Sequence, residues 1–357
     1  MSLRRLSLFL VLSILPSIAY GGSLKIAVVA PQAGNLAILG AQIVEGAQLA
    51  AGDRTSLVII DESCAENSGA ALAEKIRQAQ AVAAIGFLCT DSLEGALPTL
   101  TGAAIPAITL SVRSSILMED AIKKGWPLFR LAPSPTAERE KIIEAIFENW
   151  KDQPFAILDD GTITSRETAE TIREALEQKG MKAAFIDNFR PAQEVQTQLI
   201  RRLAKAGVTH VFAAADRNDM SIMARDSKAA NLPMVFMGGD ALNAADQLVP
   251  LEKGVFAVTL PDYATFPFAK AAYEALKAKE KPADGYVLPA HAAVTILTDA
   301  YEIASGSGAP LTQALVETPF ETTVGPIMFT GKHELATNPF VLLQWNGSSF
   351  VSPAVTE

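Results

Sequence analysis

The stretch LKIAVVAPQAGNLAILGAQIVEGAQLAAGDRTSLVII, residues 24–60, contains the first repeat of the pattern that indicates the fold. Its first seven residues are an apolar, β-branched run that predicts a buried strand, and residues 37–51 have the apolar spacing of a helix. Residues 56–60 then predict a second strand. A strand, a helix and another strand of these lengths indicate a right-handed crossover between parallel strands. The chain therefore begins as an α/β fold whose parallel sheet is covered by helices on both faces.

The same alternation continues along most of the chain. Further strands are predicted at 81–87, 106–110, 155–159, 182–189, 210–215, 234–238 and 254–260. The segment WPLFRLAPSPT, residues 126–136, interrupts the pattern with three prolines and indicates a crossing between two lobes. A second crossing is predicted near residues 260–263. Two helical segments without strands of their own, 267–279 and 287–305, are expected to return to the first lobe.

These features predict two Rossmann-like lobes with parallel sheets, joined by a multi-strand hinge. The first lobe is expected to contain residues 23–131 and 262–329, and the second lobe residues 132–261 and 330–357. Asn346-Gly347 lies between two short runs of strand composition and predicts a hairpin turn. Such an architecture places a hinged cleft between the lobes.

The N-terminus has the pattern of a secretory signal peptide, predicted over residues 1–22. Two arginines precede an apolar run from Leu6 to Ile18, and small residues follow it. An uncleaved anchor is the alternative, but the run is interrupted and shorter than the roughly 18 apolar residues that span a bilayer. Removal of Arg4 and Arg5 would move the net charge from −9 to near −11, which disfavours nucleic acid and anionic lipid as partners. We expect a mature protein that lies outside the cytoplasm.

Polar residues collect in the loops that follow the predicted strands. Parallel α/β proteins bind ligands outside the carboxyl ends of their strands. Hydroxyl, acidic and glycine residues concentrate there, in segments 31–35, 61–67, 88–92, 111–115, 159–165, 215–219 and 238–243. We therefore expect the binding residues in these loops, contributed by both lobes.

Cys64 and Cys89 are the two cysteines of the chain, and each ends one of two consecutive strands. An oxidising compartment allows them to pair, and a bridge would stabilise the fold by about 3 kcal/mol on a chain-entropy estimate. Two free buried thiols are the alternative. A bridge would fix the loop that presents Thr90, Asp91 and Ser92. Ser92 is expected either to cap the following helix or to help that helix start accept a carboxylate.

Catalytic motifs are absent from the sequence. The first strand-to-helix turn lacks GxGxxG, and the chain has neither a GxxxxGK[ST] loop nor a GxSxG elbow. His210, His291 and His333 have no metal-ligand spacing, so we expect packing or surface roles for them. Asp159 and Asp160 are adjacent at a strand end and would point to opposite sides, which favours a cap or a loop brace over acid/base catalysis. We expect no enzyme activity, no cofactor and no metal.

Four segments, together with the order of elements, resemble a known family. The segments are DESC (61–64), GFLC (86–89), MGGD (237–240) and FETTVGPIMFTGKHEL (320–335). They resemble the leucine/isoleucine/valine-binding proteins, which are type I periplasmic binding proteins of ABC importers, and the similarity covers nearly the whole mature chain. The resemblance implies a monomer that clamps a small amino acid between its lobes.

The resemblance also implies the positions of the ligand contacts. The family holds the α-carboxylate with the loop after the third strand and its neighbour, which correspond here to Thr90 and Ser111. Arg113 stands where the family usually has a small hydroxyl residue. The family's acid for the α-ammonium corresponds to Asp240, one methylene shorter than the usual glutamate.

The side-chain pocket departs from the family pattern. Three aromatic positions of the family correspond to Leu39, Thr164 and Asp216, and none of these is aromatic. A site with Arg113, Thr164 and Asp216 is more polar than a leucine site, because buried charges require partners. Two roles stay open for Arg113: a bidentate contact with the ligand carboxylate, or an internal salt bridge to Asp216 or Asp240. For Asp240, a helix cap before residues 241–248 is the alternative to ammonium binding.

The expected function is capture of a small amino acid, of branched-chain type or a more polar relative, and its delivery to the membrane permease of an ABC importer. Ligand binding would shift a hinge equilibrium toward a closed state, because only that state contacts the ligand with both lobes. A second hypothesis is a sensor domain for a small carboxylate that acts on a membrane signalling partner. An exported enzyme on the same fold is the third and weakest hypothesis.

Overall fold

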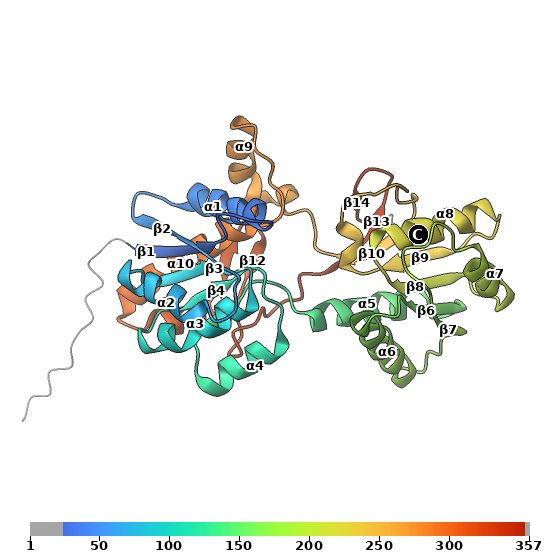
Figure 1. Cartoon of the computed structure of the whole chain (residues 1–357), viewed down its shortest axis with the longest axis horizontal. Coiled ribbons are helices and arrows are strands. Elements are labelled where there is room, and N and C mark those ends of the chain that lie inside the picture. The colour runs from blue at the N-terminus through green and yellow to red at the C-terminus, as the bar shows by residue number, and fades with distance from the viewer. Residues whose placement is uncertain (1–23, 354–357) are drawn as a thin grey trace, which may run out of the picture.

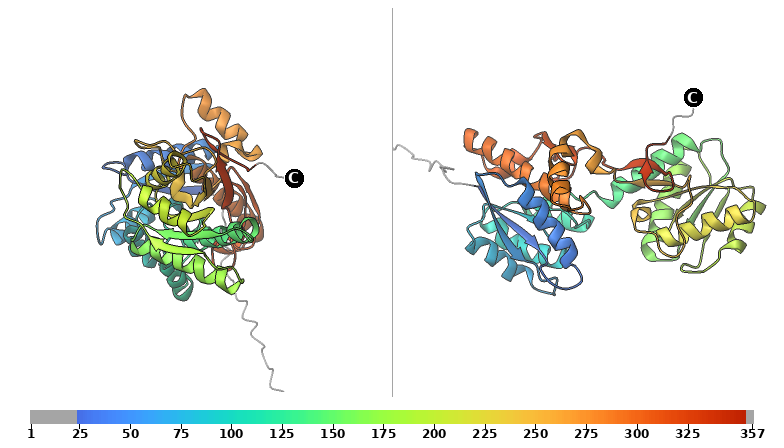
Figure 2. Two further views of the ribbon diagram at one scale, coloured as in Figure 1. Left: turned by 90° about the vertical axis from the view of Figure 1, so that its right-hand side faces the viewer. Right: turned by 90° about the horizontal axis from the view of Figure 1, so that it is seen from above.

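The protein is described by a computed structural model that covers residues 24–353, and these residues form two lobes side by side along the long axis (Figure 1). Two further views show that a few segments of chain link the lobes (Figure 2). The predicted signal peptide lies outside the described residues. Among residues 24–353, no helix combines the length and the apolar character needed to span a membrane. The predicted α/β class is confirmed, and both large sheets are parallel except for an antiparallel hairpin at one edge of the second sheet.

The first lobe is built on a five-stranded parallel sheet in the order β2-β1-β3-β4-β5. The strands are β1 (Leu24–Ala30), β2 (Thr55–Asp61), β3 (Ala83–Gly86), β4 (Ala107–Thr109) and β5 (Leu128–Arg130). Successive side chains of β1 alternate between the two faces, as the period of a strand requires. Ile26 and Val28 enter one hydrophobic cluster, while Ala27 and Val29 enter the other. All four are fully buried, which explains the continuous apolar run in the sequence.

Helices cover both faces of this sheet. One face carries α1 (Ala37–Ala50), α10 (Val287–Ser307) and α11 (Leu311–Leu315), and the other carries α2 (Gly69–Gln78), α3 (Thr90–Gly102) and α4 (Ser115–Lys124). The late helix α10 thus returns to the first lobe, as the sequence predicts. Gly46 of α1 allows α10 to approach closely, because a Cβ at Gly46 would lie 1.9 Å from the carbonyl oxygen of Val287, the first residue of α10.

Smaller elements complete the first lobe beside α10. They are the 3₁₀ turns η2 (Tyr263–Thr265) and η3 (Pro267–Ala269), α9 (Lys270–Ala278), and the antiparallel pair β11 (Phe320–Thr322) and β12 (Gly325–Ile327). Ala272 and Leu276 of α9 pack with Val287 and Leu288 of α10 in a separate small cluster.

The second lobe has a seven-stranded sheet in the order β14-β13-β10-β9-β8-β6-β7. Its parallel part contains β6 (Phe155–Asp159), β7 (Phe185–Asn188), β8 (His210–Ala214), β9 (Val235–Gly238) and β10 (Phe256–Thr259). The hairpin β13 (Val341–Trp345) and β14 (Phe350–Val351) joins antiparallel to β10. The hairpin predicted at Asn346-Gly347 is confirmed, and Gly347 has φ +107°, a conformation that favours glycine.

Helices also cover both faces of the second sheet. Residues of α5 (Pro135–Asn149) and α6 (Ile163–Gln178) form one hydrophobic cluster with it, and residues of α7 (Thr197–Lys205) and α8 (Arg217–Ala229) form the other. Three segments of chain connect the lobes. They are residues 131–134 between β5 and α5, 260–262 between β10 and η2, and 328–340 between β12 and β13.

A helix proposed for residues 241–248 is wrong, because only the 3₁₀ turn η1 (Asp240–Asn243) forms there. The Arg217 guanidinium explains where this turn ends. Its Nη1 donates to the Leu242 carbonyl oxygen and its Nε donates to Asp246 Oδ1 at 2.7 Å. The Leu242 carbonyl, which a longer helix would use, therefore has a side-chain donor instead.

Candidate interlobe binding site

The carboxyl ends of the two sheets face each other through an ion pair. Arg113 lies in the loop after β4 of the first lobe, and Asp240 begins η1 after β9 of the second lobe. Arg113 Nη2 lies 3.3 Å from Asp240 Oδ2. Because both residues follow parallel strands, the pair joins the two edges at which α/β proteins bind ligands.

Asp240 is oriented by donors of its own lobe. Its Oδ1 accepts a hydrogen bond from Thr259 Oγ1 at 2.7 Å and one from the Leu260 backbone N–H at 3.4 Å. Thr259 ends β10 and is completely buried. These bonds turn the second oxygen, Oδ2, toward Arg113, so the direction of the carboxylate is set before any ligand arrives.

Glu138 adds a second carboxylate to the same cluster. It lies in the first turn of α5, accepts the Asp240 backbone N–H at 2.8 Å through Oε1, and places Oε2 3.9 Å from Arg113 Nη1. Burial raises the pKa of Glu138, and the nearby charge of Asp240 raises it further. We call Arg113, Glu138 and Asp240 the interlobe cluster.

Aromatic residues at the ends of two crossing segments border the interlobe cluster. The Arg113 guanidinium lies 5.7 Å from the centre of the Phe340 ring, at the end of the third crossing. Tyr263 follows the second crossing, and burial together with the charge of Asp240 raises the pKa of its hydroxyl. The interlobe cluster therefore lies next to the crossing segments, so a rotation of one lobe against the other would change its contacts.

The remaining predicted contact residues occupy the same edges of the two sheets. Thr90 is the exposed first residue of α3 and Ser111 follows β4, and the preceding strands β3 and β4 are neighbours. Thr164 is exposed in the first turn of α6. Asp216 is also exposed and caps α8 by accepting the Asp219 backbone N–H at 2.8 Å. Ligand contact by these four residues stays a prediction.

Of the roles left open for Arg113, the structure contains the ion pair, and its partner is Asp240 rather than Asp216. Leu39 is half-buried within α1. The buried neighbour of Asp216, Asp219, accepts the Ala192 N–H at 2.9 Å. Burial raises the pKa of Asp219 to about 6, and the charges of Asp216 and Asp160 contribute. The second-lobe edge thus has an excess of negative charge.

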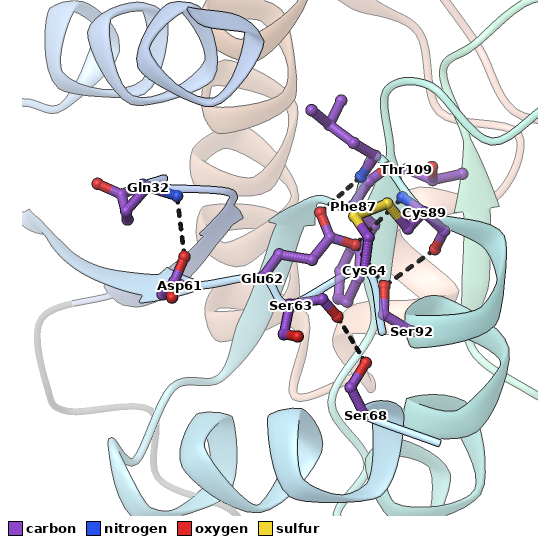
Figure 3. The surroundings of a disulfide bond; sticks show 11 residues. Gln32, Asp61, Glu62, Ser63, Cys64, Ser68, Phe87, Cys89, Ser92 and Thr109 are labelled. Atoms are coloured by element: carbon purple, nitrogen blue, oxygen red, sulfur yellow. Dashed lines mark hydrogen bonds between the residues drawn. A yellow bond between two sulfur atoms is a disulfide. The ribbon is translucent and has the colours of Figure 1, made fainter. Parts of the chain in front are cut away.

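Cys64 and Cys89 form a disulfide with a Cα–Cα distance of 5.6 Å (Figure 3). The side chain of Glu62 reaches across to the loop that ends at Cys89 (Figure 3). It accepts the backbone N–H groups of Leu88 at 2.8 Å and Cys89 at 3.2 Å. Glu62 is 3% exposed, and burial raises its pKa. The disulfide and this carboxylate together fix the loop that leads to Thr90.

The predicted cap role of Ser92 is wrong, because α3 begins one turn earlier than expected and Cys89 is its N-cap residue. The buried Ser92 hydroxyl instead hydrogen-bonds to Glu62 Oε1 and to the Cys89 carbonyl oxygen, the latter at 3.0 Å. Since Glu62 takes the amides of Leu88 and Cys89, a ligand carboxylate at this helix start would depend on the amides from Thr90 onward.

Glu62 and Glu138 are the site residues that sequence reasoning missed. Glu62 lies within the segment DESC, two residues before Cys64, and this position beside a cysteine is the signal that could have identified it. Glu138 follows Ser134, whose hydroxyl accepts the Ala137 N–H at 3.0 Å at the start of α5. Its place in a predicted first turn was visible, but its partner in the other lobe was not.

Metal binding and histidine chemistry have no site in this cluster. Across residues 24–353, the one group of three potential metal ligands is Glu62, Cys64 and Cys89, and both sulfur atoms belong to the disulfide. Burial lowers the pKa values of His210, His291 and His333.

Asp159 and Asp160 brace their loop, as expected, by accepting the N–H groups of residues 161 and 162.

Comparison with known sequences gives a consistent family assignment. A family model described as periplasmic binding protein matches residues 23–349. The leucine-, isoleucine-, valine-, threonine- and alanine-binding protein of Pseudomonas aeruginosa is 26% identical over 341 residues, which cover 91% of this chain and 90% of that protein. The leucine-specific-binding protein of Salmonella typhimurium is 28% identical over 363 residues, covering 94% of each chain.

Solved structures share the fold at lower sequence identity. A putative branched-chain amino acid ABC transporter protein from Rhodospirillum rubrum has a TM-score of 0.76 at 17% identity, covering 93% of this chain and 100% of that one. A solute-binding protein of an ABC transporter from Rhodopseudomonas palustris, in complex with p-hydroxybenzoic acid, has a TM-score of 0.67 at 14% identity, with 90% and 92% covered. The fold of this chain is thus shared by ABC transporter proteins of other bacteria at low sequence identity.

Proposed function

Because the chain belongs to the periplasmic binding protein family, in the type I group of the leucine/isoleucine/valine-binding proteins, we propose that it captures a small amino acid between its lobes and delivers it to an ABC permease. Its family consists of solute-binding proteins, not enzymes. In this proposal residues 1–22 are a cleaved export signal and the mature protein acts as a periplasmic monomer. Residues 23–131 with 262–329 move against residues 132–261 with 330–357.

One observation supports an amino acid as the ligand: an ion pair between Arg113 and Asp240, with 3.3 Å between the charged atoms, joins the two lobes. An amino acid can replace this pair by placing its carboxylate on Arg113 and its ammonium on Asp240. The exchange keeps every charge partnered, which a partly buried site requires. A ligand with only one of the two charges would leave Asp240 without a cation, or would leave Arg113 with only the longer contact to Glu138 at 3.9 Å.

The surrounding residues support the same orientation. Thr259 and Leu260 hold Asp240 through its other oxygen, so Oδ2 is the atom that would receive the ammonium group. Arg113 has planar donors suited to a carboxylate, and Thr90 and Ser111 follow the strands on its own lobe. Because the ligand would connect both lobes, its binding would favour the arrangement in which they are closest.

The interlobe cluster already has two acids and one base, and burial together with the charge of Asp240 raises the pKa of Glu138. An amino acid brings no net charge and leaves this balance unchanged. A free anion would add a third negative charge beside Glu138 and Asp240. The cluster therefore favours a zwitterion over a simple carboxylate.

Isothermal titration calorimetry tests the proposal. The protein is unfolded and refolded to remove any ligand that co-purifies, and is then titrated with the standard amino acids and with their organic-acid analogues. We expect one ligand per chain and binding of at least one amino acid. Absence of heat across the panel, with refolding verified by circular dichroism, would remove the proposal.

A further inference from the structure

A second candidate binding site lies at the hinge, apart from the interlobe cluster. It is a cavity of about 600 Å³ between α4, the first crossing and the third crossing. Cavities that bind small molecules in proteins occupy roughly 300–1,000 Å³. We call it the hinge cavity, and its lining includes Met118, Ile122, Arg130, Pro133 and Leu335.

Arg130 is the polar group that makes this cavity unusual. It ends β5, and its side chain is 1% exposed. Its Nε and Nη2 atoms bind the two carboxylate oxygens of Glu334, at 2.9 and 2.5 Å. Its Nη1 atom is buried and has no hydrogen-bond partner. An unpaired buried donor is costly, so an acceptor that entered from the cavity and displaced the side chains covering Nη1 would be favourable.

The charges around the cavity favour an uncharged occupant. Glu334 already neutralises Arg130, and on the α4 wall Lys123 lies 3.4 Å from Glu119. The other two charged lining residues, Glu140 and Lys332, have opposite signs, so the lining has no net charge. The walls between them include the apolar side chains of Met118, Ile122 and Leu335. An added carboxylate would compete with Glu334 for the same guanidinium. A neutral oxygen acceptor would complete the guanidinium without disturbing that pair.

The cavity is built from the segments that must move when the lobes rotate. Residues 132–134 of the first crossing and 335–339 of the third both line it. Asn338 also donates through Nδ2 to the Ala137 carbonyl oxygen at 2.7 Å, which ties the third crossing to the start of α5. A molecule bound here would contact both crossings and α4 of the first lobe. It would therefore bind one hinge arrangement better than another.

We propose that the hinge cavity is a second ligand site, for a small uncharged molecule with an apolar body and one oxygen acceptor, and that its occupation shifts the hinge equilibrium. On binding, the side chains that cover Arg130 Nη1 shift, Nη1 donates to the acceptor, and the residues of α4 and Leu335 enclose the apolar body. The inference does not depend on the identity of the ligand between the lobes.

Methyl NMR of the full mature chain tests binding without any interlobe ligand. Methionine methyl groups are labelled with ¹³C, and the protein is titrated with acetophenone or with ethylbenzene, which has a similar shape but no carbonyl. We expect acetophenone to move the Met118 signal saturably, with at least tenfold weaker binding of ethylbenzene. Met223, buried in the second lobe, is the internal control.

Two variants separate the cavity from non-specific binding. Ile122→Trp fills the cavity from an exposed position of α4, and we expect it to abolish the Met118 shift. Ile303→Trp is a matched exposed position on α10 outside the cavity, and we expect it to leave the shift unchanged. Absence of a shift with acetophenone, or equal binding of both probes, would overturn the proposed site.

The coupling to the hinge has its own readout. Cysteines introduced at Ala70 of α2 and Glu167 of α6, both exposed, carry spin labels for an interlobe distance measurement. We expect saturating acetophenone to change the distance distribution in the wild-type background and to leave it unchanged with Ile122→Trp. An unchanged distribution in the wild-type background would overturn the coupling.

Discussion

If a bound amino acid replaces the Arg113–Asp240 ion pair, removing either charged side chain should change the ligand preference. The two variants should change it in opposite directions. Asp240→Asn keeps the shape of the side chain, whose Oδ1 accepts from Thr259 and Leu260, and releases Arg113. Arg113→Gln releases Asp240. The first variant should bind a ligand that has only a carboxylate better than the wild type does. The second should bind a ligand that has only an ammonium group better.

The magnitude follows from the geometry of the pair. The two charged atoms are 3.3 Å apart, and the side chains are 35% and 24% exposed. Fully exposed pairs contribute about 0.2–1 kcal/mol and desolvated ones about 2–5 kcal/mol, so this partly exposed pair is worth about 1–2 kcal/mol. A ligand with one charge must break the pair in the wild type but not in the variant. Its affinity should therefore rise by about 5- to 30-fold.

Calorimetry with three matched compounds measures this effect: leucine, 4-methylpentanoate, which lacks the ammonium, and 3-methylbutylamine, which lacks the carboxylate. Asp240→Asn should gain affinity for 4-methylpentanoate, and Arg113→Gln for 3-methylbutylamine. Glu252→Gln removes one charge of the surface pair with Lys228 and should change none of the three affinities. If neither variant gains affinity for its compound, the pair is not exchanged on binding and the reasoning is refuted.

Three further predictions concern the framework that holds the site. Gly46→Ala should lower the free energy of unfolding by about 1–3 kcal/mol or more in urea denaturation, because its Cβ would meet the Val287 carbonyl oxygen at 1.9 Å; an unchanged midpoint would contradict the close helix contact. Asp219→Asn should make the free energy of unfolding less dependent on pH between about 4 and 6. The pKa of Asp219 is raised from 3.8 to about 6 in the folded state, so the wild type loses stability as the pH rises through this window. Equal slopes of stability against pH for the two proteins would contradict this prediction. Glu62→Gln should lower the free energy of unfolding by about 1–3 kcal/mol, because the amide –NH₂ would face a backbone or hydroxyl donor. A thiol assay checks that the disulfide is intact in the variant. Unchanged stability would refute the role of Glu62 in holding the loop.

Local sequence patterns were sufficient for the fold. Continuous apolar runs such as residues 24–30 are typical of strands buried on both faces, and that pattern needs no knowledge of distant residues. The Pro-rich segment at 126–136 contains the first crossing for the same local reason. The return of α10 to the first lobe was predictable because that helix had no strand of its own to cover.

The site was only partly predictable, because its contacts connect residues far apart in the chain. Arg113 and Asp240 each follow a strand, so both could be selected, yet the sequence left Asp216 as an equal partner for Arg113. The structure separates the two acids because the exposed Asp216 caps α8, whereas donors of β10 turn Asp240 toward the other lobe. Glu138 lies on a helix rather than after a strand, so the rule that found the others did not find it.

A crystal structure with a bound amino acid, the tightest ligand in the calorimetric panel, would show whether the ligand replaces the Arg113–Asp240 ion pair. We expect the ligand carboxylate to lie within hydrogen-bond distance of the Arg113 guanidinium and its ammonium to lie against Asp240 Oδ2. The direct contact between these two residues should then be broken. A bound ligand that leaves Arg113 and Asp240 joined at their present 3.3 Å would contradict it.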